Sequence, residues 1–242
     1  MFRGQDEAFL PSSISGLALW LDAADASTFT LDGSNNVSEW RDKSGNARHA
    51  TQGTTLLRPA YGTQTQNGLN LVVTNAAGLT RVITGSIASS DFFGASRNTG
   101  TQFRVFKYVS GTLPGGFHRA DTVFNDTIIW RTDQFHAFMH GSYNDTANTV
   151  FGSNWFTANM GIYVASYDIA NQQVLLRRDK TAFVTLNLGS NAAFNTTNMT
   201  WANNWDAAAA TIYEAEMLHY NRILTTAEIE QVESYISVKW GI

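Results

Sequence analysis

Apolar residues along the chain gather in short runs separated by turn signals, a pattern typical of β-strands. Leu17–Leu21 is apolar throughout, which predicts a strand buried on both faces, whereas Phe103–Val109 alternates. The predicted strands are Leu17–Leu21, Val37–Arg41, Leu69–Val73, Phe103–Val109, Thr127–Arg131, Phe135–His140, Met160–Ile169, Gln173–Arg178, Ala182–Leu188 and Thr211–Asn221. Residues 85–101 and 189–204, rich in Gly, Ser, Asn and Thr, predict long loops. This many short strands predict an all-β sandwich or jelly roll.

The C-terminal segment carries clear helix signals. The run TTAE from Thr225 to Glu228 fits a capping box, in which each of these two residues bonds the backbone of the other. The apolar residues that then recur at helical spacing on one face are Ile229, Val232, Ile236 and Trp240. We expect a helix that ends at Gly241 and packs this apolar stripe on the sheet.

The segment before the first predicted strand has a different character. Residues 1–13 indicate an N-terminal arm for anchoring or assembly, with Phe2, Phe9 and Leu10 as its apolar contacts. No repeat or composition change divides the remainder, so residues 14–242 are predicted to form one domain.

Composition narrows the classes of function. The 242 residues include 0 Cys, which excludes disulfides and a cysteine nucleophile. A net charge of -4 and a pI near 5.7 argue against a nucleic-acid binder. Only 15% of residues are charged, so polar uncharged residues must cover the surface, as is common in extracellular and virion proteins. The start MFRGQDEAFLPSS lacks a signal-peptide pattern and no run approaches a membrane span, so we expect synthesis in a host cytoplasm.

The two ends of the chain carry a family resemblance. The segment ISGLALWLDAADASTFTLDGSNNVSEWRDKSGNARHATQ (Ile14–Gln52) resembles the opening of concanavalin A-like, laminin-G-like jelly rolls of bacterial surface proteins and tailed-bacteriophage structural proteins. The segment EAEMLHYNRILTTAEIEQVESYISVKWGI (Glu214–Ile242) is similar to the family's ending, whereas Gly85 to Asn159 matches nothing in the family. The resemblance implies a two-sheet concanavalin A-like jelly-roll sandwich with a C-terminal helix.

The resemblance also implies a set of structural positions. They are Trp20, Asp22, Trp40, Asp42, Gly45, Asn46, Glu216, Asn221, Arg222 and Trp240. In this family the Trp-x-Asp-Lys-Ser-Gly-Asn run is a strand end followed by a tight turn, and Gly45 and Asn46 both tolerate positive φ. A Ca²⁺ site is the alternative, because Ca²⁺ prefers oxygen ligands. Its candidate carboxylates, which would otherwise serve as caps and Asx turns, are those of Asp22, Asp25, Asp32 and Asp42.

Acidic side chains are the candidates for catalysis, and histidines are the candidates for a zinc site. Glu214 and Glu216 lie two apart on a predicted strand, so both carboxylates would point to one face. Acidic pairs of this kind serve glycoside hydrolases, but the concanavalin A-like glucanases carry Glu-x-Asp-x-Glu and this chain has only Glu-Ala-Glu. The histidines at His118, His136, His140 and His219 form no metal-binding spacing. We therefore expect a non-enzymatic protein without a metal site.

Aromatic residues in the middle and late segments are the candidates for binding carbohydrate. A pyranose stacks on an aromatic ring while neighbouring amides bond its hydroxyls, although the same rings also suit a core or a subunit interface. The candidate glycan contacts are Trp201, Trp205, Trp155 and Tyr143, with Trp130 and Phe156 in the wider group. Trp201 and Trp205, in MTWANNWD, are expected on an exposed loop.

Together these features predict a virion structural protein of a tailed bacteriophage. It would be a capsid decoration or a head- or tail-associated protein that displays a lectin-like domain in the virion. Its expected partners are other virion proteins, such as the major capsid protein, and host-surface glycans, and it is expected to form a homo-oligomer. The alternative is a carbohydrate-binding lectin module, cellular or viral, that acts through loop aromatics. A third hypothesis, a glycoside hydrolase, depends on Glu214 and Glu216.

Overall fold

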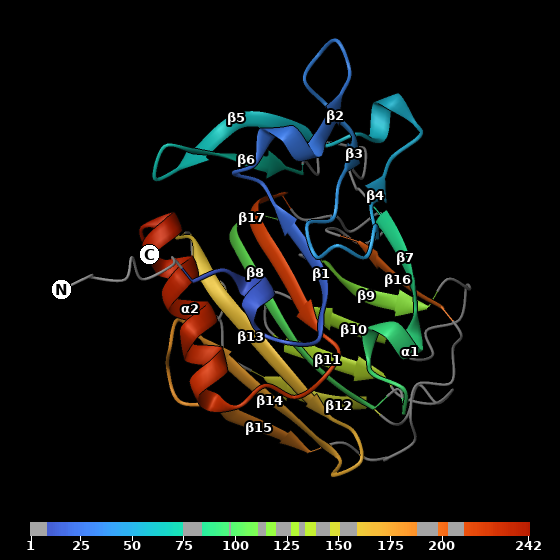
Figure 1. The fold of residues 1–242 in the computed structure, drawn as a ribbon, viewed down its shortest axis with the longest axis vertical. Coiled ribbons are helices and arrows are strands. Elements are labelled where there is room, and N and C mark those ends of the chain that lie inside the picture. Colours follow the sequence, from blue (N-terminus) through green and yellow to red (C-terminus); the bar gives the residue numbers. More distant parts are fainter. Residues whose placement is uncertain are drawn as a thin grey trace, which may run out of the picture.

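The described residues form two antiparallel β-sheets and a C-terminal helix, in agreement with the predicted all-β class (Figure 1). The computed structural model describes residues 9–74, 84–96, 98–110, 115–119, 127–130, 134–138, 146–150, 159–187, 198–202 and 211–242. It describes the backbone alone for residues 84–87, 89, 115–119, 127–130, 134–138, 146–150 and 198–202.

The first sheet contains eight strands within these ranges, in the order β15-β14-β13-β8-β17-β6-β5, with β1 also paired to β17. Its strands are β1 (Leu17–Asp22), β5 (Ala60–Gln66), β6 (Leu69–Val73), β8 (Thr99–Ser110), β13 (Gly161–Asp168), β14 (Gln173–Arg178), β15 (Val184–Asn187) and β17 (Thr211–Tyr220). The apolar runs predicted all but one of them, β5 being the exception. Its sequence AYGTQTQ ends in four polar residues, and Tyr61 is its only large apolar residue. It therefore lacks the apolar run that predicts a strand.

The second sheet contains nine strands in the described chain, in the order β12-β11-β10-β9-β16-β7-β4-β3-β2. Its strands are β2 (Phe29–Leu31), β3 (Val37–Trp40), β4 (Ala50–Thr51), β7 (Thr84–Ala88), β9 (Gly115–Arg119), β10 (Thr127–Trp130), β11 (Gln134–Phe138), β12 (Thr146–Val150) and β16 (Asn198–Ala202). Trp40 of β3 is fully buried and stacks on Phe29, with ring centroids 5.2 Å apart.

The prediction of loops over residues 85–101 and 189–204 is wrong in part. Strands β7 and β16 lie in these segments and pair with each other from Ala88↔Asn198 to Thr84↔Ala202. The first segment also contains the short helix α1 (Ser89–Phe92). These strands are rich in small and polar residues, so a search for apolar runs does not detect them. They form because backbone hydrogen bonds to the partner strand do not depend on the side chains.

Helix α2 (Thr226–Trp240) covers the outer face of the first sheet (Figure 1), and its predicted features are confirmed. Thr225 Oγ1 accepts a hydrogen bond from the Glu228 amide at 3.3 Å, and Glu228 Oε2 accepts one from the Thr225 amide at 2.8 Å. Gly241 ends the helix in the left-handed conformation, with φ 67. The predicted stripe, all of it buried, is Ile229, Val232, Ile236 and Trp240.

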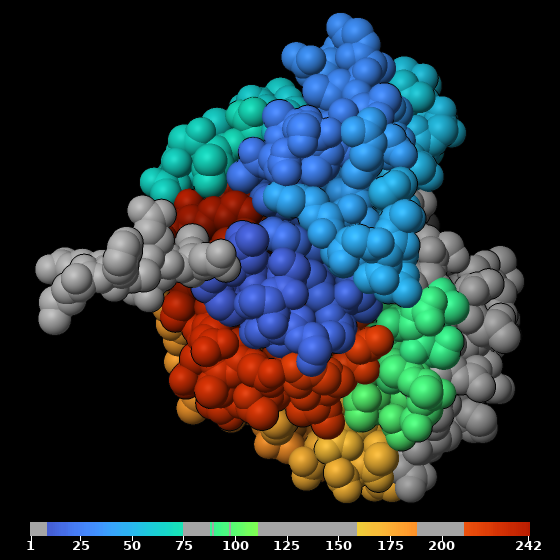
Figure 2. All heavy atoms as spheres, in the orientation of Figure 1, coloured from blue at the N-terminus to red at the C-terminus, as the bar shows by residue number. Residues whose placement is uncertain are grey.

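The opening and closing segments of the chain lie side by side, as Figure 2 shows in blue and red. β1 pairs with β17 from Leu17↔Tyr220 to Asp22↔Glu216. Short 3-10 helices complete this region. They are η1 (Pro11–Ser13), η2 (Ala26–Thr28) and η3 (Thr55–Leu57).

Candidate functional site

The buried carboxylate of Glu216 joins both ends of the chain beneath α2. It accepts hydrogen bonds from the indole N–H groups of Trp20 and Trp240, each at 2.7 Å. Lys239 Nζ donates to it at 3.0 Å and the Tyr235 hydroxyl at 3.2 Å. Burial raises the pKa of Glu216, and the charge of Lys239 opposes that rise. These bonds attach the helix to the sheet, so Glu216 occupies a structural position.

Asp22 extends this network toward the surface. Its carboxylate accepts hydrogen bonds from Lys239 Nζ at 2.6 Å and from Lys43 Nζ at 2.8 Å. Lys43 also reaches Asp25 at 2.9 Å, and its ammonium lies 4.6 Å from the centroid of the Trp20 ring. Both oxygens of Asp22 are therefore engaged by lysines.

The turn after β3 is organised by Asp42. Its carboxylate accepts hydrogen bonds at 2.8 to 3.0 Å from the backbone N–H groups of Trp20, Ser44 and Arg48. Gly45 adopts φ 89, as the tight turn requires. The second residue with positive φ is Ala47 (φ 55) and not Asn46, whose side-chain amide instead donates to the Leu17 carbonyl at 3.0 Å.

The other two candidate Ca²⁺ ligands, Asp25 and Asp32, also bind neighbouring protein groups. Asp25 caps η2 by accepting from Ser27, and Asp32 accepts from the amides of Ser34 and Asn36. Across the ranges that the structure describes, no group of three or more His, Cys, Asp or Glu side chains is arranged to hold a metal ion. This is the geometry of helix caps and Asx turns.

Two further structural positions that the resemblance implies, Asn221 and Arg222, connect the end of β17 with α2 and with the start of the chain. Asn221 donates its backbone N–H to the Gly16 carbonyl at 2.9 Å, and Arg222 Nε donates to the Ser15 carbonyl at 3.0 Å. Arg222 also pairs with Glu228, with Nη1 to Oε2 at 3.0 Å. The hydrogen bond from Arg222 lowers the pKa of Glu228 to about 2.

Glu214 and Glu216 do not share a face, so that prediction is wrong. Glu214 pairs with Phe106 and Glu216 with Val105, which are consecutive residues of β8, and Ala215 is the extra residue of a β-bulge. Consecutive strand residues point to opposite faces, so the two carboxylates do as well. Glu214 points away from α2 and accepts from Arg104 at 3.2 Å (Nε) and 2.6 Å (Nη2).

Of the candidate histidines, the three that the structure describes lie on three different strands. His219 is buried, its ring stacks on Phe92, and burial lowers its pKa to about 3. His118 lies on β9 and His136 on β11, while His140 lies outside the described residues.

The candidate glycan contacts divide between a strand and segments that are not described. Trp201 lies in β16, opposite Gly85 of β7 and Phe117 of β9, so its predicted place on an exposed loop is wrong. The other candidates, which lie outside the described residues together with Phe2 of the arm, are Trp205, Trp155, Tyr143 and Phe156. Trp130 ends β10.

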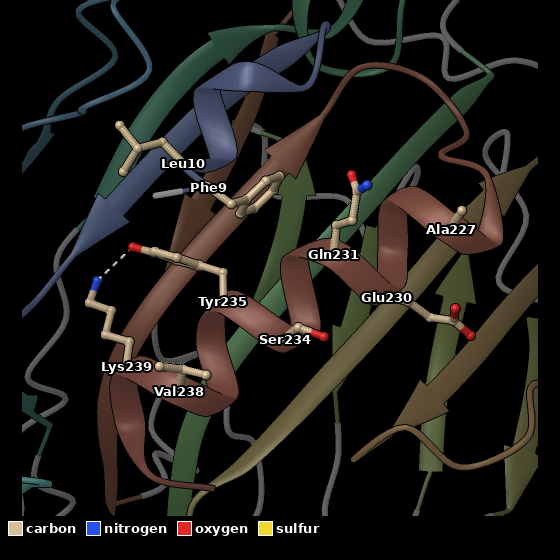
Figure 3. Close-up of a pocket in the computed structure, with 9 residues that line it drawn as sticks. All are labelled: Phe9, Leu10, Ala227, Glu230, Gln231, Ser234, Tyr235, Val238 and Lys239. Carbon is tan, nitrogen blue, oxygen red and sulfur yellow. Dashed lines mark hydrogen bonds between the residues drawn. The ribbon is translucent and has the colours of Figure 1, made fainter. Parts of the chain in front are cut away.

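A groove of about 780 Å³ runs along the outer side of α2 (Figure 3). One wall is the arm, where Phe9 meets Tyr235 edge-on with ring centroids 6.1 Å apart and Leu10 is half-exposed. The residues that line the groove are Phe9, Leu10, Ala227, Glu230, Gln231, Ser234, Tyr235, Val238 and Lys239. Apolar atoms dominate its surface, so it suits an apolar polypeptide segment better than a sugar.

A second hollow, of about 370 Å³, lies between the end of α2 and the β14–β15 turn. Its exposed polar residues are Asn159, Asp179 and Lys180, with Ser237 on the helix side. The nearly buried side chains of Met160 and Ile162 form its apolar base, and the exposed Ile242 adds an apolar edge. Hydrogen-bonding groups around an apolar floor are what a sugar-binding pocket needs.

Solved structures of low sequence identity share this fold. The binding domain of botulinum neurotoxin DC, solved in complex with SialylT, is 10% identical with a TM-score of 0.59, over 94% of this chain and 52% of that one. The binding domain of Paraclostridial Mosquitocidal Protein 1 is 11% identical with a TM-score of 0.65, over 93% and 53%. Trypanosoma rangeli sialidase is 14% identical with a TM-score of 0.50, over 93% and 33%.

The present chain therefore spans about half the length of the two toxin binding domains and a third of the sialidase. No protein-family model matches the chain, and no curated protein matches its sequence. No helix in the described ranges has the length and hydropathy to cross a membrane. The comparisons thus show a β-sandwich fold that toxin binding domains and a sialidase also contain.

Proposed function

We propose that the protein is a non-enzymatic, lectin-like binding module that recognises glycans on a cell surface. The observation that carries this proposal is the likeness over 94% of the chain to a toxin binding domain that was solved with SialylT. It favours the lectin alternative over the virion role as the description of what the domain does.

The carboxylate geometry supports a non-enzymatic role. Retaining glycosidases need two carboxyl groups about 5–5.5 Å apart on one side of the substrate, and inverting ones a wider pair. Glu214 and Glu216 point to opposite faces of the sheet. Both carboxylates are fully buried and accept hydrogen bonds from other side chains. Neither carboxylate is positioned to protonate or attack a bound sugar.

Of the two hollows described above, the more polar one, between the end of α2 and the β14–β15 turn, suits a glycan better. Asn159 and Lys180 bring exposed polar side chains to the hollow, where they can face sugar hydroxyl or carboxylate groups, while the exposed side chain of Ile242 can contact the ring carbons. Trp155, one of the candidate stacking residues, lies four positions before Asn159 in the sequence.

A glycan array is the direct test. The wild-type protein should retain a defined set of glycans, and the double variant Asn159→Ala, Lys180→Ala should bind them at least about tenfold more weakly, the loss of about 1.4 kcal/mol. Leu56→Ala, an exposed change in η3, is the matched control and should bind normally. A wild-type protein that retains no glycan would show that the proposed function is wrong.

The aromatic candidates are tested separately. Trp205→Ala and Trp155→Ala should each weaken binding while leaving the circular dichroism spectrum unchanged. Trp201→Ala is a poor probe, because Trp201 lies in a central strand and its loss can act through stability.

We also propose the tailed-phage virion, with the major capsid protein as partner, as the setting in which this module is displayed. The test is co-purification with particles after removal of residues 1–8. Removing residues 1–13 confounds that test, because Pro11 is buried and its carbonyl accepts the Tyr220 hydroxyl at 2.9 Å. If the shortened protein still enters particles, the arm is not the anchor.

A further inference from the structure

The charged side chains that line the second hollow, between the end of α2 and the β14–β15 turn, are unequally engaged. They are Arg178, Asp179 and Lys180, three consecutive residues of the turn. Asp179 uses both carboxylate oxygens within the protein, because Oδ1 accepts from the Ile162 amide and Oδ2 from Arg178 Nε, each at 2.7 Å. The pair of Asp179 and Arg178 therefore adds little net charge to the hollow.

Lys180 carries the unbalanced charge of this lining. Its side chain is exposed, and in the described chain no carboxylate lies within ion-pair distance of its ammonium. Its charge does act on Glu233, since burial raises the pKa of Glu233 and the charges of Arg177 and Lys180 oppose that rise. Glu233 is fully buried, however, and accepts a hydrogen bond from Arg177 at 2.7 Å. Lys180 is thus able to bind an anion from outside the protein.

The backbone of the turn holds Lys180 in an unfavourable conformation. Asp179 has φ 46 and Lys180 has φ 61, and the Thr181 amide donates to the Arg178 carbonyl at 2.9 Å. Two consecutive residues with positive φ are typical of a type I′ turn, which prefers Asn and Gly at these positions. A lysine is disfavoured there because its Cβ lies close to the following carbonyl oxygen. Strained positions of this kind are concentrated at ligand-binding sites.

We propose that this hollow binds an acidic saccharide and that the Lys180 ammonium holds its anionic group, a carboxylate or a sulfate. The inference rests on the proposed function and names the class of glycan. Hydrogen bonds between ionised groups are roughly twice as strong as those between neutral ones. The apolar base of Met160 and Ile162 lowers the local dielectric constant, which strengthens the attraction. The volume of about 370 Å³ falls within the range of small-ligand sites, ~300–1,000 Å³.

The glycan array provides the test when each neutral glycan is compared with its sialylated and its sulfated counterpart. At low salt the wild-type protein should bind acidic counterparts about fivefold more tightly than neutral ones, as expected of one exposed ion pair. This preference should shrink in about 1 M salt, where the charges are screened. A preference for sialylated glycans alone identifies a carboxylate ligand, one for sulfated glycans alone a sulfate, and one for both shows that charge alone decides.

Substitutions assign the preference to Lys180. Lys180→Gln should bind acidic and neutral counterparts equally, whereas Lys180→Arg should keep the preference. Arg41→Gln removes the same charge at an exposed position outside the hollow and should also keep it. All these changes are at exposed residues, and circular dichroism should show an unchanged fold.

The outcomes separate this inference from the proposed function. Equal binding of acidic and neutral counterparts by the wild-type protein would overturn the inference and leave the proposed function intact. A preference for acidic glycans that survives Lys180→Gln would do the same. A wild-type protein that binds no glycan on the array would overturn both.

Discussion

The ion pair between Arg104 and Glu214 allows a quantitative test of the structural role of Glu214. Both side chains are fully buried, and two hydrogen bonds join them, at 2.6 and 3.2 Å. The guanidinium also lies 4.8 Å from the centroid of the Phe106 ring. The test uses Arg104→Met, Glu214→Leu and the double variant, since Met retains a favourable contact with an aromatic ring.

The expected magnitudes follow from burial. Each single variant breaks the buried pair by removing one partner, which should lower the free energy of unfolding by about 3–5 kcal/mol. The double variant removes both charges and should lie within about 2 kcal/mol of the parent, because well-packed apolar pairs often replace buried ion pairs without loss. The coupling energy between the two sites should therefore be at least about 4 kcal/mol.

The pH dependence has a defined sign. Burial raises the pKa of Glu214, and Arg104 opposes that rise. Without Arg104 the rise is larger, so above the ordinary pKa the folded state of Arg104→Met binds more protons than the unfolded state. Its free energy of unfolding should therefore fall further below the parent value as the pH increases from about 5 to 8.

Urea unfolding followed by fluorescence measures these free energies. The control is Arg41→Met, which breaks an exposed pair with Glu39 and exposed hydrogen bonds to Ser27 and Thr30, and which should cost about 1 kcal/mol. A double variant as unstable as the sum of the two single variants would refute the argument, because it would mean that the two residues act independently.

Three further predictions concern the elements that position α2. Glu216→Gln should lower the free energy of unfolding by about 3–5 kcal/mol in urea titrations, because an amide cannot accept hydrogen bonds from both indole N–H groups. Glycan binding per folded molecule should not change. The pKa of Glu228 is lowered to about 2, so its carboxylate stabilises the folded state above its ordinary pKa, and this stabilisation is lost as the pH falls through about 2. In Glu228→Gln the free energy of unfolding should therefore fall less steeply as the pH is lowered through this range, as measured by urea titrations at several pH values. Gly94→Ala should lower the melting temperature, since Gly94 has φ 74 and an added Cβ would lie 2.9 Å from the Asn221 carbonyl oxygen.

The sequence by itself determined the elements whose stabilising contacts lie within a few residues of one another. The capping box at Thr225 and the apolar stripe from Ile229 to Trp240 specify α2 through contacts within a few residues of one another. The apolar runs marked most strands of the first sheet for the same reason, because a strand buried on both faces must be apolar along its length.

Only the tertiary structure decided the features that depend on distant partners. The bulge at Ala215 arises from pairing with β8, and it reverses the side to which Glu216 points. Strands β7 and β16 exist because they pair with each other across more than a hundred residues of sequence. The groove on α2 needs Phe9 from the opposite end of the chain. In each case the deciding contact joins residues that no local window of sequence contains, so no periodicity or propensity could have revealed it.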